Sequence, residues 1–324
     1  MDEQGMTKKR ISVVMPAYNC DATICVTLDS LIGQRRRPDE IIVVDDHSDN
    51  PVIQVLGDRY PGVQILRHEV NKGVQHARNT GFSHVTGDYV YFLDADDILC
   101  PEFLSVMLEA LEENEQAAAC FGSFYQCFDG NAAPILETHR EQEADVALLS
   151  RGEGLTFYLN NTGAFIPSFS IFRRSALEEI CVDGNLFLPE LKNNEDFHMF
   201  ARILAKFDVL HVKNPMGVYF LRPDSISRNL VKVWSSRAVA VDSLIAQANI
   251  LPLSVYHLAF LKRMRAIAAR QHARVLANGG ERKEASRRLF EEFKRLPDIK
   301  TFILLVLVTL GLQKKKIEYG GSEY

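Results

Sequence analysis

The stretch at residues 89–97, Tyr-Val-Tyr-Phe-Leu-Asp-Ala-Asp-Asp, joins five apolar residues directly to an acidic cluster. Five consecutive apolar residues of aromatic and branched types predict a strand that is buried on both faces. Similar short apolar runs occupy residues 11–15, 41–44 and 63–66, and helical patterns separate these runs. Buried strands that alternate with helices indicate a doubly wound α/β domain with a mainly parallel sheet.

Polar residues follow three of these expected strands. Such folds bind ligands just beyond the carboxyl ends of their strands, so we expect the three clusters to lie at one edge of the sheet. Carboxylates gathered there repel each other unless a cation or hydrogen-bond donors compensate them. A metal ion together with a ligand rich in hydroxyl groups would do both. The clusters are Pro16, Ala17, Tyr18 and Asn19; Asp45, Asp46, His47, Ser48 and Asp49; and Asp94, Ala95, Asp96 and Asp97.

Asp94 and Asp96 are separated by one residue at the end of the apolar run. Two carboxylates in this position can hold a divalent cation through oxygen ligands. The same cluster could instead place negative charge near a helix that we expect to start at Pro101. The position of the pair, opposite Asp45 and Asp46, favours the metal site.

The second half of the chain has weaker patterns. A domain boundary is expected near Arg228, with the α/β domain at residues 1–228 and a Lys- and Arg-rich helical region at residues 229–324. Within the first domain we predict a helix over residues 143–159, an amphipathic helix over 193–207, and strands over 168–172, 209–212 and 217–221. The stretch between Phe121 and Phe172 is poorly patterned, and if the ligand is a sugar, its pocket residues are expected there.

The composition narrows the class of protein. Of the 324 residues, 47% are hydrophobic and 24% are charged, which is ordinary for a soluble globular protein. The net charge of −5 gives no general reason to expect nucleic-acid binding. The first ten residues are polar and show no secretory signal, and the six cysteines contain no CxxC pair. These features predict free thiols and a cytoplasmic location.

Five motifs together resemble those of family 2 glycosyltransferases in order and spacing. The resemblance covers roughly residues 10–228 and implies an inverting enzyme with the GT-A fold. It implies transfer of a sugar from a nucleoside diphosphate, expected to be UDP, to an acceptor hydroxyl, in bacterial-type surface polysaccharide or glycolipid synthesis. The motifs are Pro16-Ala17-Tyr18-Asn19, Asp45-Asp46-His47-Ser48-Asp49, Asn71-Lys72-Gly73 with Ala77-Arg78-Asn79-Thr80-Gly81, Asp94-Ala95-Asp96-Asp97, and Glu195-Asp196.

The resemblance also implies roles for single residues. The loop formed by Pro16, Ala17, Tyr18 and Asn19 is expected against the nucleotide, with Asp46 hydrogen-bonded to the base. Asp96 is expected to ligate Mn²⁺ or Mg²⁺, with Asp94 beside the ribose or the metal's water shell. Asp196 is expected to take the proton from the acceptor hydroxyl, and Glu195 to support it on the acceptor side. A capping role is the alternative for Asp46, and placement of acids at a helix start is the alternative for Glu195 and Asp196.

Three further positions are candidates for the nucleotide site, with alternatives left open. Asn71 or Lys72 would line the nucleoside, and Arg78 would neutralise phosphate, unless Arg78 is only a solvated helix residue. Arg222 stands where many relatives have a histidine. A guanidinium cannot ligate a metal, but it can pair with phosphate oxygens; a helix cap is the alternative for this segment.

The apolar run at residues 302–308, followed by Lys314, Lys315 and Lys316, is too short to span a bilayer, which requires about 20 apolar residues. Two interpretations are open: a buried packing helix, or peripheral membrane contact through the segment from Phe302 to Lys316 at the inner face. In the second interpretation the lysines contact anionic headgroups close to a lipid-linked acceptor.

Two other kinds of protein share some of these features, a phosphatase and a non-catalytic binder. A haloacid-dehalogenase-type phosphatase also has an Asp-x-Asp motif, but it has Thr or Val where this chain has Ile98, and it leaves Asp45 and Asp46 unexplained. A non-catalytic nucleotide-sugar binder has no need of a base such as Asp196. A dehydrogenase is excluded because Pro16 stands where a GxGxxG turn would begin.

Overall fold

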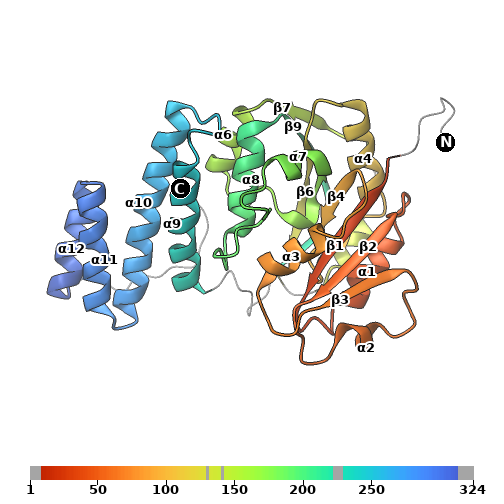
Figure 1. Cartoon of the computed structure of the whole chain (residues 1–324), viewed down its shortest axis with the longest axis horizontal. Helices are drawn as coiled ribbons and strands as arrows, with labels where there is room; N and C mark the ends of the chain where they lie inside the picture. Colours follow the sequence, from red (N-terminus) through yellow and green to blue (C-terminus); the bar gives the residue numbers. More distant parts are fainter. Residues whose placement is uncertain (1–8, 129–130, 140–141, 222–228, 313–324) are drawn as a thin grey trace. The chain divides into compact units, whose positions relative to one another are not determined.

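The computed structural model describes residues 9–128, 131–139, 142–221 and 229–312 (Figure 1). The chain divides into two compact units, Met1–Pro223 and Asp224–Tyr324, close to the boundary expected near Arg228. All strands of the described ranges lie in the first unit, whereas the described part of the second unit is helical.

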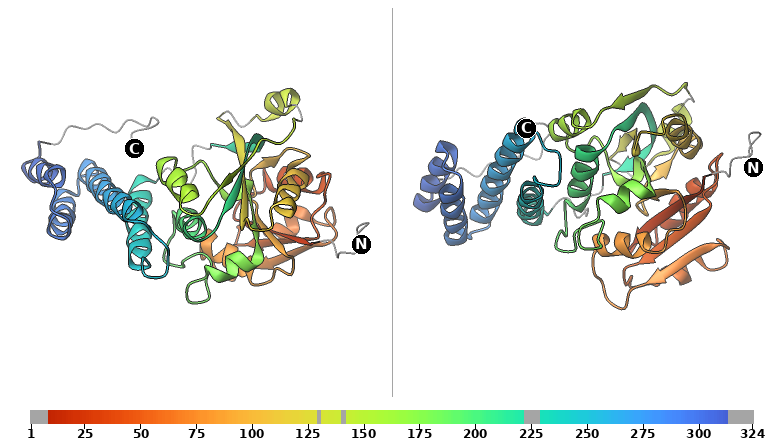
Figure 2. Two further views of the ribbon diagram at one scale, coloured as in Figure 1. Left: turned by 90° about the horizontal axis from the view of Figure 1, so that it is seen from above. Right: turned by 45° about the horizontal axis from the view of Figure 1, so that its top comes forward.

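The described strands of the first unit form one sheet (Figures 1 and 2). Its order is β3-β2-β1-β4-β8-β6-β9-β5, and β7 pairs with β9 outside this path. The strands are β1 Ile11–Ala17, β2 Glu40–Asp45, β3 Val63–Arg67, β4 Tyr89–Phe92, β5 Ile98–Leu99, β6 Ala119–Cys127, β7 Val146–Leu149, β8 Ser170–Arg173 and β9 Val209–Phe220.

One strand in the middle of the sheet, β8, runs opposite to its neighbours. Strands β3, β2, β1 and β4 are parallel to one another. Strand β8 is antiparallel to both of its neighbours, β4 and β6, while β6 and β9 are parallel. The predicted α/β fold is therefore confirmed, and its doubly wound part comes from the first four apolar runs.

Helices cover both faces of the parallel part. Alternate residues of β1, including Val13 and Met15, belong to the core cluster that also contains α1 and α4, whereas Ile42 and Val44 of β2 pack against Ala77 of α3. The helices of this unit are α1 Ile24–Ile32, α2 Val52–Leu56, α3 Val74–Phe82, α4 Phe103–Glu113, α5 Ala133–Thr138, α6 Glu153–Asn160, α7 Arg174–Glu179 and α8 Glu195–Lys206, with a 3-10 turn at Pro167–Phe169.

Helix α3 approaches β1 unusually closely. A Cβ atom placed on Gly81 would lie 2.2 Å from Cγ1 of Val14, so the contact admits only a glycine without a rearrangement. This glycine explains how a short polar helix is held firmly against the sheet beside the expected ligand edge.

Several predictions for the second half are corrected. The helix predicted over residues 143–159 is strand β7 followed by α6, because residues 146–149 pair with β9 and this pairing overrides the helical tendency of Ala and Leu. The two strands predicted over residues 209–221 are the single strand β9, which continues past register shifts in its pairing with β6. Strand β6 was not predicted.

Helix α8 confirms the helix predicted over residues 193–207, but the amphipathic interpretation is wrong. Every residue of α8 is buried except Asp196 and Lys206. Even the guanidinium of Arg202 is buried, where it donates hydrogen bonds to the carbonyl groups of Ile180 and Leu186. The loop before the helix therefore covers the face that the sequence pattern assigns to solvent.

The second unit contains α9 Leu230–Ala246, α10 Val255–Asn278, α11 Arg282–Arg295 and α12 Ile299–Leu310. Leu304 and Val308 of α12 pack with Leu276 of α10 and Leu289 of α11. The opposite side of α12 exposes Ile303 and Leu310. Among the helices described here, none has both the length and the apolarity needed to cross a membrane.

Candidate active site

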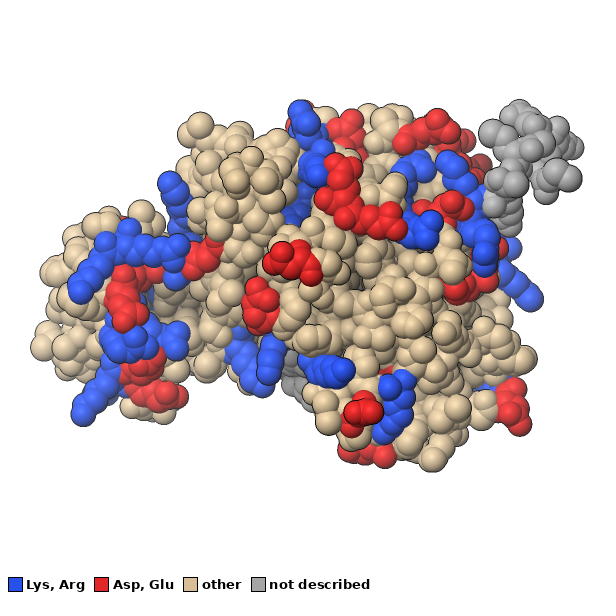
Figure 3. Space-filling model, viewed as in Figure 1, with Lys and Arg blue, Asp and Glu red and all other residues tan. Residues whose placement is uncertain are grey.

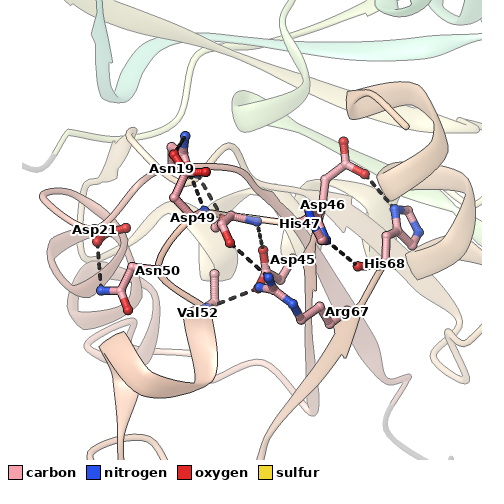
Figure 4. Close-up of polar contacts among 11 residues, drawn as sticks. Asn19, Asp21, Asp45, Asp46, His47, Asp49, Asn50, Val52, Arg67 and His68 are labelled. Atoms are coloured by element: carbon pink, nitrogen blue, oxygen red, sulfur yellow. Dashed lines mark hydrogen bonds and ion pairs between the residues drawn. The ribbon is translucent and has the colours of Figure 1, made fainter. Parts of the chain in front are cut away.

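The loops after β1 and β2 are joined by Asn19 (Figure 4). Its side chain donates to Asp49 Oδ2 (3.0 Å) and accepts from the Asp49 backbone N–H (2.9 Å), and its backbone N–H donates to Ser48 Oγ (3.0 Å). Asn19 has φ 48°, a left-handed conformation that asparagine tolerates better than most residues. Tyr18, which precedes Asn19, is 51% exposed, whereas Ala17 at the end of β1 is buried.

The buried side chain of Asp45 holds the loop after β2 in place. Its buried carboxylate accepts hydrogen bonds from the backbone N–H groups of Ser48 (2.8 Å) and Val52 (3.1 Å) and pairs with Arg67 (Figure 4). Burial raises the pKa of Asp45, but these hydrogen bonds outweigh burial and leave the pKa below its usual range. Asp45 is therefore an ionised structural acceptor.

Asp46 is bonded to the Asn71–Gly73 motif. Its Oδ1 accepts from the Lys72 backbone N–H (2.9 Å) and lies 2.7 Å from Nδ1 of His68, and its Oδ2 accepts from the Gly73 backbone N–H (2.7 Å). Nε2 of His68 lies 2.9 Å from Thr80 Oγ1 on α3. Sequence reasoning did not find His68, because a single His in a loop carries no pattern, and it gave Thr80 no role of its own within its motif. Asn71 and the Lys72 side chain are exposed.

Helix α3 also binds the segment that leads to α8. Gln75 Nε2 donates to the Pro189 carbonyl (3.1 Å). Asn79 donates to the Phe187 carbonyl (2.6 Å) and accepts from the Phe187 N–H (2.9 Å). The polar side chains of this motif therefore connect the first loops of the sheet to the second half of the unit.

Arg78 bridges two of the predicted site motifs. Its Nη2 lies 2.6 Å from Asp94 Oδ1 and its Nη1 lies 2.8 Å from Glu195 Oε1, while the guanidinium lies over the Phe187 ring at 5.5 Å from the centroid. The residue is only 3% exposed, so the alternative of a solvated helix position is wrong. Burial opposes the charged form, but Asp94 and Glu195 outweigh it and raise the pKa of Arg78 above its usual value.

The acidic motif after β4 does not cap a helix. Strand β5 follows it, and α4 begins only at Phe103 with Glu102 as the N-cap. Asp94 and Asp96 are partly exposed, whereas Asp97 is fully buried. The Asp94 backbone N–H donates to Ser168 Oγ (3.1 Å), a contact that the sequence pattern did not reveal.

The charges in this motif fit a divalent cation. Burial, with the negative charges of Asp96 and Asp94, raises the pKa of Asp97 well above its usual range. Arg78 pairs directly with Asp94. Oxygen ligands at the end of a buried strand are the donor set that Mg²⁺ and Mn²⁺ prefer.

Glu195 and Asp196 form the first turn of α8, after Asn194 in a left-handed conformation (φ 60°). Glu195 is buried against Arg78, whereas Asp196 is partly exposed. Burial and the charge of Asp196 raise the pKa of Glu195 to about 7, and Arg78 opposes this shift. The two acids therefore differ in environment: one holds Arg78, and the other is accessible.

Tyr219 of β9 lies beside both groups of acids. Its pKa is raised first by burial and then by the negative charges of Asp97, Asp94, Asp96 and Asp196. Its ring also packs edge-on against Phe124, with 5.7 Å between centroids. A lone tyrosine in a strand gives no sequence signal, so this residue was missed.

Residues 12–181, more than half of the chain, match a family profile described as Glycosyl transferase family 2. The chain belongs to this family. The resemblance to family 2 glycosyltransferases is thereby confirmed, and the family is not that of haloacid-dehalogenase-type phosphatases. Arg222 lies outside the described residues, so its expected phosphate contact stays a prediction.

Similar proteins agree with this assignment. The chain is 36% identical over 229 residues to the uncharacterized glycosyltransferase YibD of Escherichia coli K12, covering 68% of this chain and 63% of YibD. It is 33% identical over 105 residues to UDP-Glc:alpha-D-GlcNAc-diphosphoundecaprenol beta-1,3-glucosyltransferase WfgD of Escherichia coli, covering 32% of this chain and 42% of WfgD. The chain thus spans less than two thirds of the length of either relative.

The fold has close structural counterparts. The crystal structure of S. aureus TarS 1–349 in complex with UDP-GlcNAc matches with a TM-score of 0.65 at 18% sequence identity, covering 93% of this chain and 87% of that chain. The likeness confirms the α/β fold of GT-A type with helices at the C-terminal end.

Proposed function

We propose that this glycosyltransferase moves a sugar from a UDP-linked donor to a hydroxyl of a saccharide or glycolipid acceptor, with inversion, in bacterial-type surface polysaccharide or glycolipid synthesis. The observation that carries the proposal is the Arg78 bridge, which joins Asp94 of the donor motif to Glu195 beside Asp196. The bridge connects the expected metal site to the expected base within one buried network. A non-catalytic binder would not need an accessible carboxylate at that point.

Asp196 is the general base in this proposal. It takes the proton of the acceptor hydroxyl while the hydroxyl oxygen bonds to the anomeric carbon of the sugar. The bond from that carbon to the diphosphate oxygen breaks, and its electron pair leaves with the nucleoside diphosphate. Attack from the face opposite the leaving group inverts the anomeric centre. Glu195 is the supporting residue rather than the base, because Arg78 occupies its Oε1.

Asp96 would hold the divalent cation, with Asp94 beside the ribose or the water shell of the metal. When bound, Mn²⁺ or Mg²⁺ supplies positive charge that compensates the departing diphosphate. The nucleotide would lie against Pro16, Ala17, Tyr18 and Asn19, near Asn71 and Lys72. Among the described contacts, Asp46 Oδ2 accepts one hydrogen bond, and a carboxylate oxygen has room for a second, from the imide N–H of uracil. The UDP and UDP-Glc in the names of TarS and WfgD support this choice of base.

UDP together with Mn²⁺ is expected to stabilise the protein more than either ligand alone, because a cation held by Asp96 would compensate the charge of the diphosphate. Saturation at about 100 times the dissociation constant corresponds to about 2.7 kcal/mol, a shift of several degrees in melting temperature. Thermal unfolding with and without a chelator measures this effect, and Asp96→Asn should remove the contribution of the metal. Equal stabilisation by UDP in the chelator would contradict the metal bridge. Stronger stabilisation by GDP or dTDP would contradict the uracil contact and leave the reaction class unchanged.

The exposed face of α12 suggests where the protein encounters its acceptor. It carries the exposed side chains of Ile299, Phe302, Ile303, Val306 and Leu310. Residues 224–324 contain 18 Lys and Arg against 9 Asp and Glu, a net charge of +9, whereas residues 1–223 have a net charge of −14. In Figure 3 the outermost left edge, where α12 lies, is largely tan, while basic and acidic side chains lie beside it.

An apolar helix face in a basic unit fits an anionic lipid surface. We propose that α12 lies in the interface at the cytoplasmic, inner face of a membrane that holds a lipid-linked acceptor, as the name of WfgD describes for that enzyme. The buried-helix interpretation is correct for the other side of α12, where Leu304 and Val308 join the core. Lys314, Lys315 and Lys316 lie outside the described residues.

Replacing both Phe302 and Ile303 by Glu is expected to release the protein from vesicles that contain phosphatidylglycerol, measured by co-sedimentation. Activity on a soluble acceptor and the melting temperature should stay unchanged, because both side chains are exposed. Val255→Glu with Tyr256→Glu adds the same charge at another exposed apolar pair and should leave binding intact. Truncation before α12 is a poorer test, because it would open the core around Leu304. Persistent vesicle binding of the Phe302 and Ile303 variant would contradict the interfacial role.

A further inference from the structure

Cys100, Glu102 and His139 form a cluster of metal-ligating side chains outside the catalytic network. One ligand atom from each residue lies within 4.8 Å of the other two, and His139 Nε2 lies 2.5 Å from Glu102 Oε1. Cys100 and Glu102 are buried, and His139 is largely covered. The three residues come from two places: the start of α4, and the end of α5 on the segment between β6 and β7.

The usual structural role of an acidic residue at a helix start does not explain Glu102. It is the N-cap of α4, yet its side chain accepts no capping hydrogen bond and faces His139 instead. The His139 ring is held in place by Tyr125, which it meets edge-on with 6.2 Å between centroids. Cys100 is fixed through its backbone, which donates to the Met216 carbonyl and accepts from Gln34. Three different ligand types are therefore held toward one point.

We propose that this cluster binds Zn²⁺ through Cys100 Sγ, one carboxylate oxygen of Glu102 and Nε2 of His139. Thiolate, imidazole and carboxylate together are the ligands of zinc, whereas Mg²⁺ and Mn²⁺ prefer oxygen alone. Binding displaces the thiol proton of Cys100 to solvent and separates His139 from Glu102 enough to admit the ion. Water completes a tetrahedral shell as the fourth ligand.

The zinc would fasten the segment between β6 and β7 to the start of α4. Strand β5 links that start to the Asp94–Asp96 motif, so the clamp acts on the backbone directly after the donor site. The same segment falls within the stretch expected to contact the sugar. The ion would thus be a structural clamp, chemically distinct from the cation expected at the Asp94–Asp96 motif.

Cobalt titration of chelator-treated protein tests the proposal. Co²⁺ bound to a thiolate gives an intense near-ultraviolet charge-transfer band, which the oxygen ligands of the catalytic motif cannot produce. We expect this band at one equivalent in the full chain, and its loss on addition of Zn²⁺. Cys100→Ser should abolish the band. His139→Gln should weaken zinc binding by at least about 10- to 100-fold, the effect seen even for residues that only orient ligands.

Matched variants separate this site from the rest of the protein. Cys181→Ser removes another partly buried thiol and should keep the band, and Asp96→Asn should keep it as well. Circular dichroism of His139→Gln, whose side chain is near the surface, checks that the fold is retained even if Cys100→Ser fails to fold. Absence of the band in the unmodified chain would overturn the proposal, and so would its persistence in Cys100→Ser. Neither outcome bears on the glycosyltransferase mechanism, which uses other residues.

Discussion

Asp196→Asn is expected to reduce sugar transfer by roughly 10²- to 10⁴-fold, the usual contribution of a positioned general base. Asparagine keeps the size of the side chain at the start of α8 but cannot take a proton. Donor binding should barely change, because Asp196 lies on the acceptor side in our assignment. Turnover with a saturating donor, together with donor titration by calorimetry, separates the two effects.

Asp96→Asn is the matched control for that experiment. It removes a charged oxygen ligand from the expected cation site, so donor affinity and its metal dependence should both fall. A loss of turnover without a loss of donor affinity in Asp196→Asn, and a loss of donor affinity in Asp96→Asn, would separate the catalytic role from the binding role. Near-normal turnover of Asp196→Asn would contradict the mechanism at its central residue, and Glu195 would then be the candidate base.

Arg78→Ala is expected to destabilise the N-terminal unit and to inactivate the enzyme. Removing the bridge leaves Asp94 and Glu195 without their shared cation, and breaking a buried ion pair on one side costs about 3–5 kcal/mol. For a unit of this size that corresponds to a fall of roughly 6–20 °C in melting temperature. Thermal unfolding and transfer assays at a temperature where the variant remains folded measure both effects.

Two comparisons test whether the bridge is the cause. Arg59→Ala breaks an exposed pair with Asp29 and should change the melting temperature little. Combining Arg78→Ala with Glu195→Gln removes one of the orphaned charges, so the double variant should be more stable than Arg78→Ala alone. If Arg78→Ala left both stability and activity intact, the proposed connection between donor and acceptor sides would be wrong.

The parallel half of the fold was predictable because each of its strands is a short, almost purely apolar run. Strands β1 to β4 match the predicted runs closely, and helices separate them as the alternating pattern predicted. Strand β6 was missed because its sequence, Ala-Cys-Phe-Gly-Ser-Phe-Tyr-Gln-Cys, mixes small, polar and aromatic residues without a period. Strand β7 was mistaken for helix because four residues are too few to show a period, and only pairing with β9 decides their conformation.

The sequence pointed to the carboxylates of the candidate site, but not to the contacts that join them. Motifs at strand ends pointed to Asp46, Asp94 and Asp96, because several carboxylates at one edge require an explanation. Asp196 became a candidate only through the family resemblance. The contact between Arg78 and Glu195 spans 117 positions, and no local pattern reports such a distance along the chain. The same holds for Tyr219, which joins the site only because β9 pairs with β5, the strand directly after the acidic motif.

Helix α3 has a consequence for engineering the specificity of this enzyme. Its composition is polar, which in an alignment-free design would mark it as a surface helix open to variation. Yet its side chains make contacts that hold the site together. Gln75 and Asn79 hydrogen-bond to the segment before α8, and Arg78 pairs with Glu195 at its start. Thr80 lies against His68, and Gly81 packs against β1. Libraries that seek a new sugar or acceptor should therefore leave α3 constant, as they would a hydrophobic core, and draw their diversity from the connections that β6 and β7 carry.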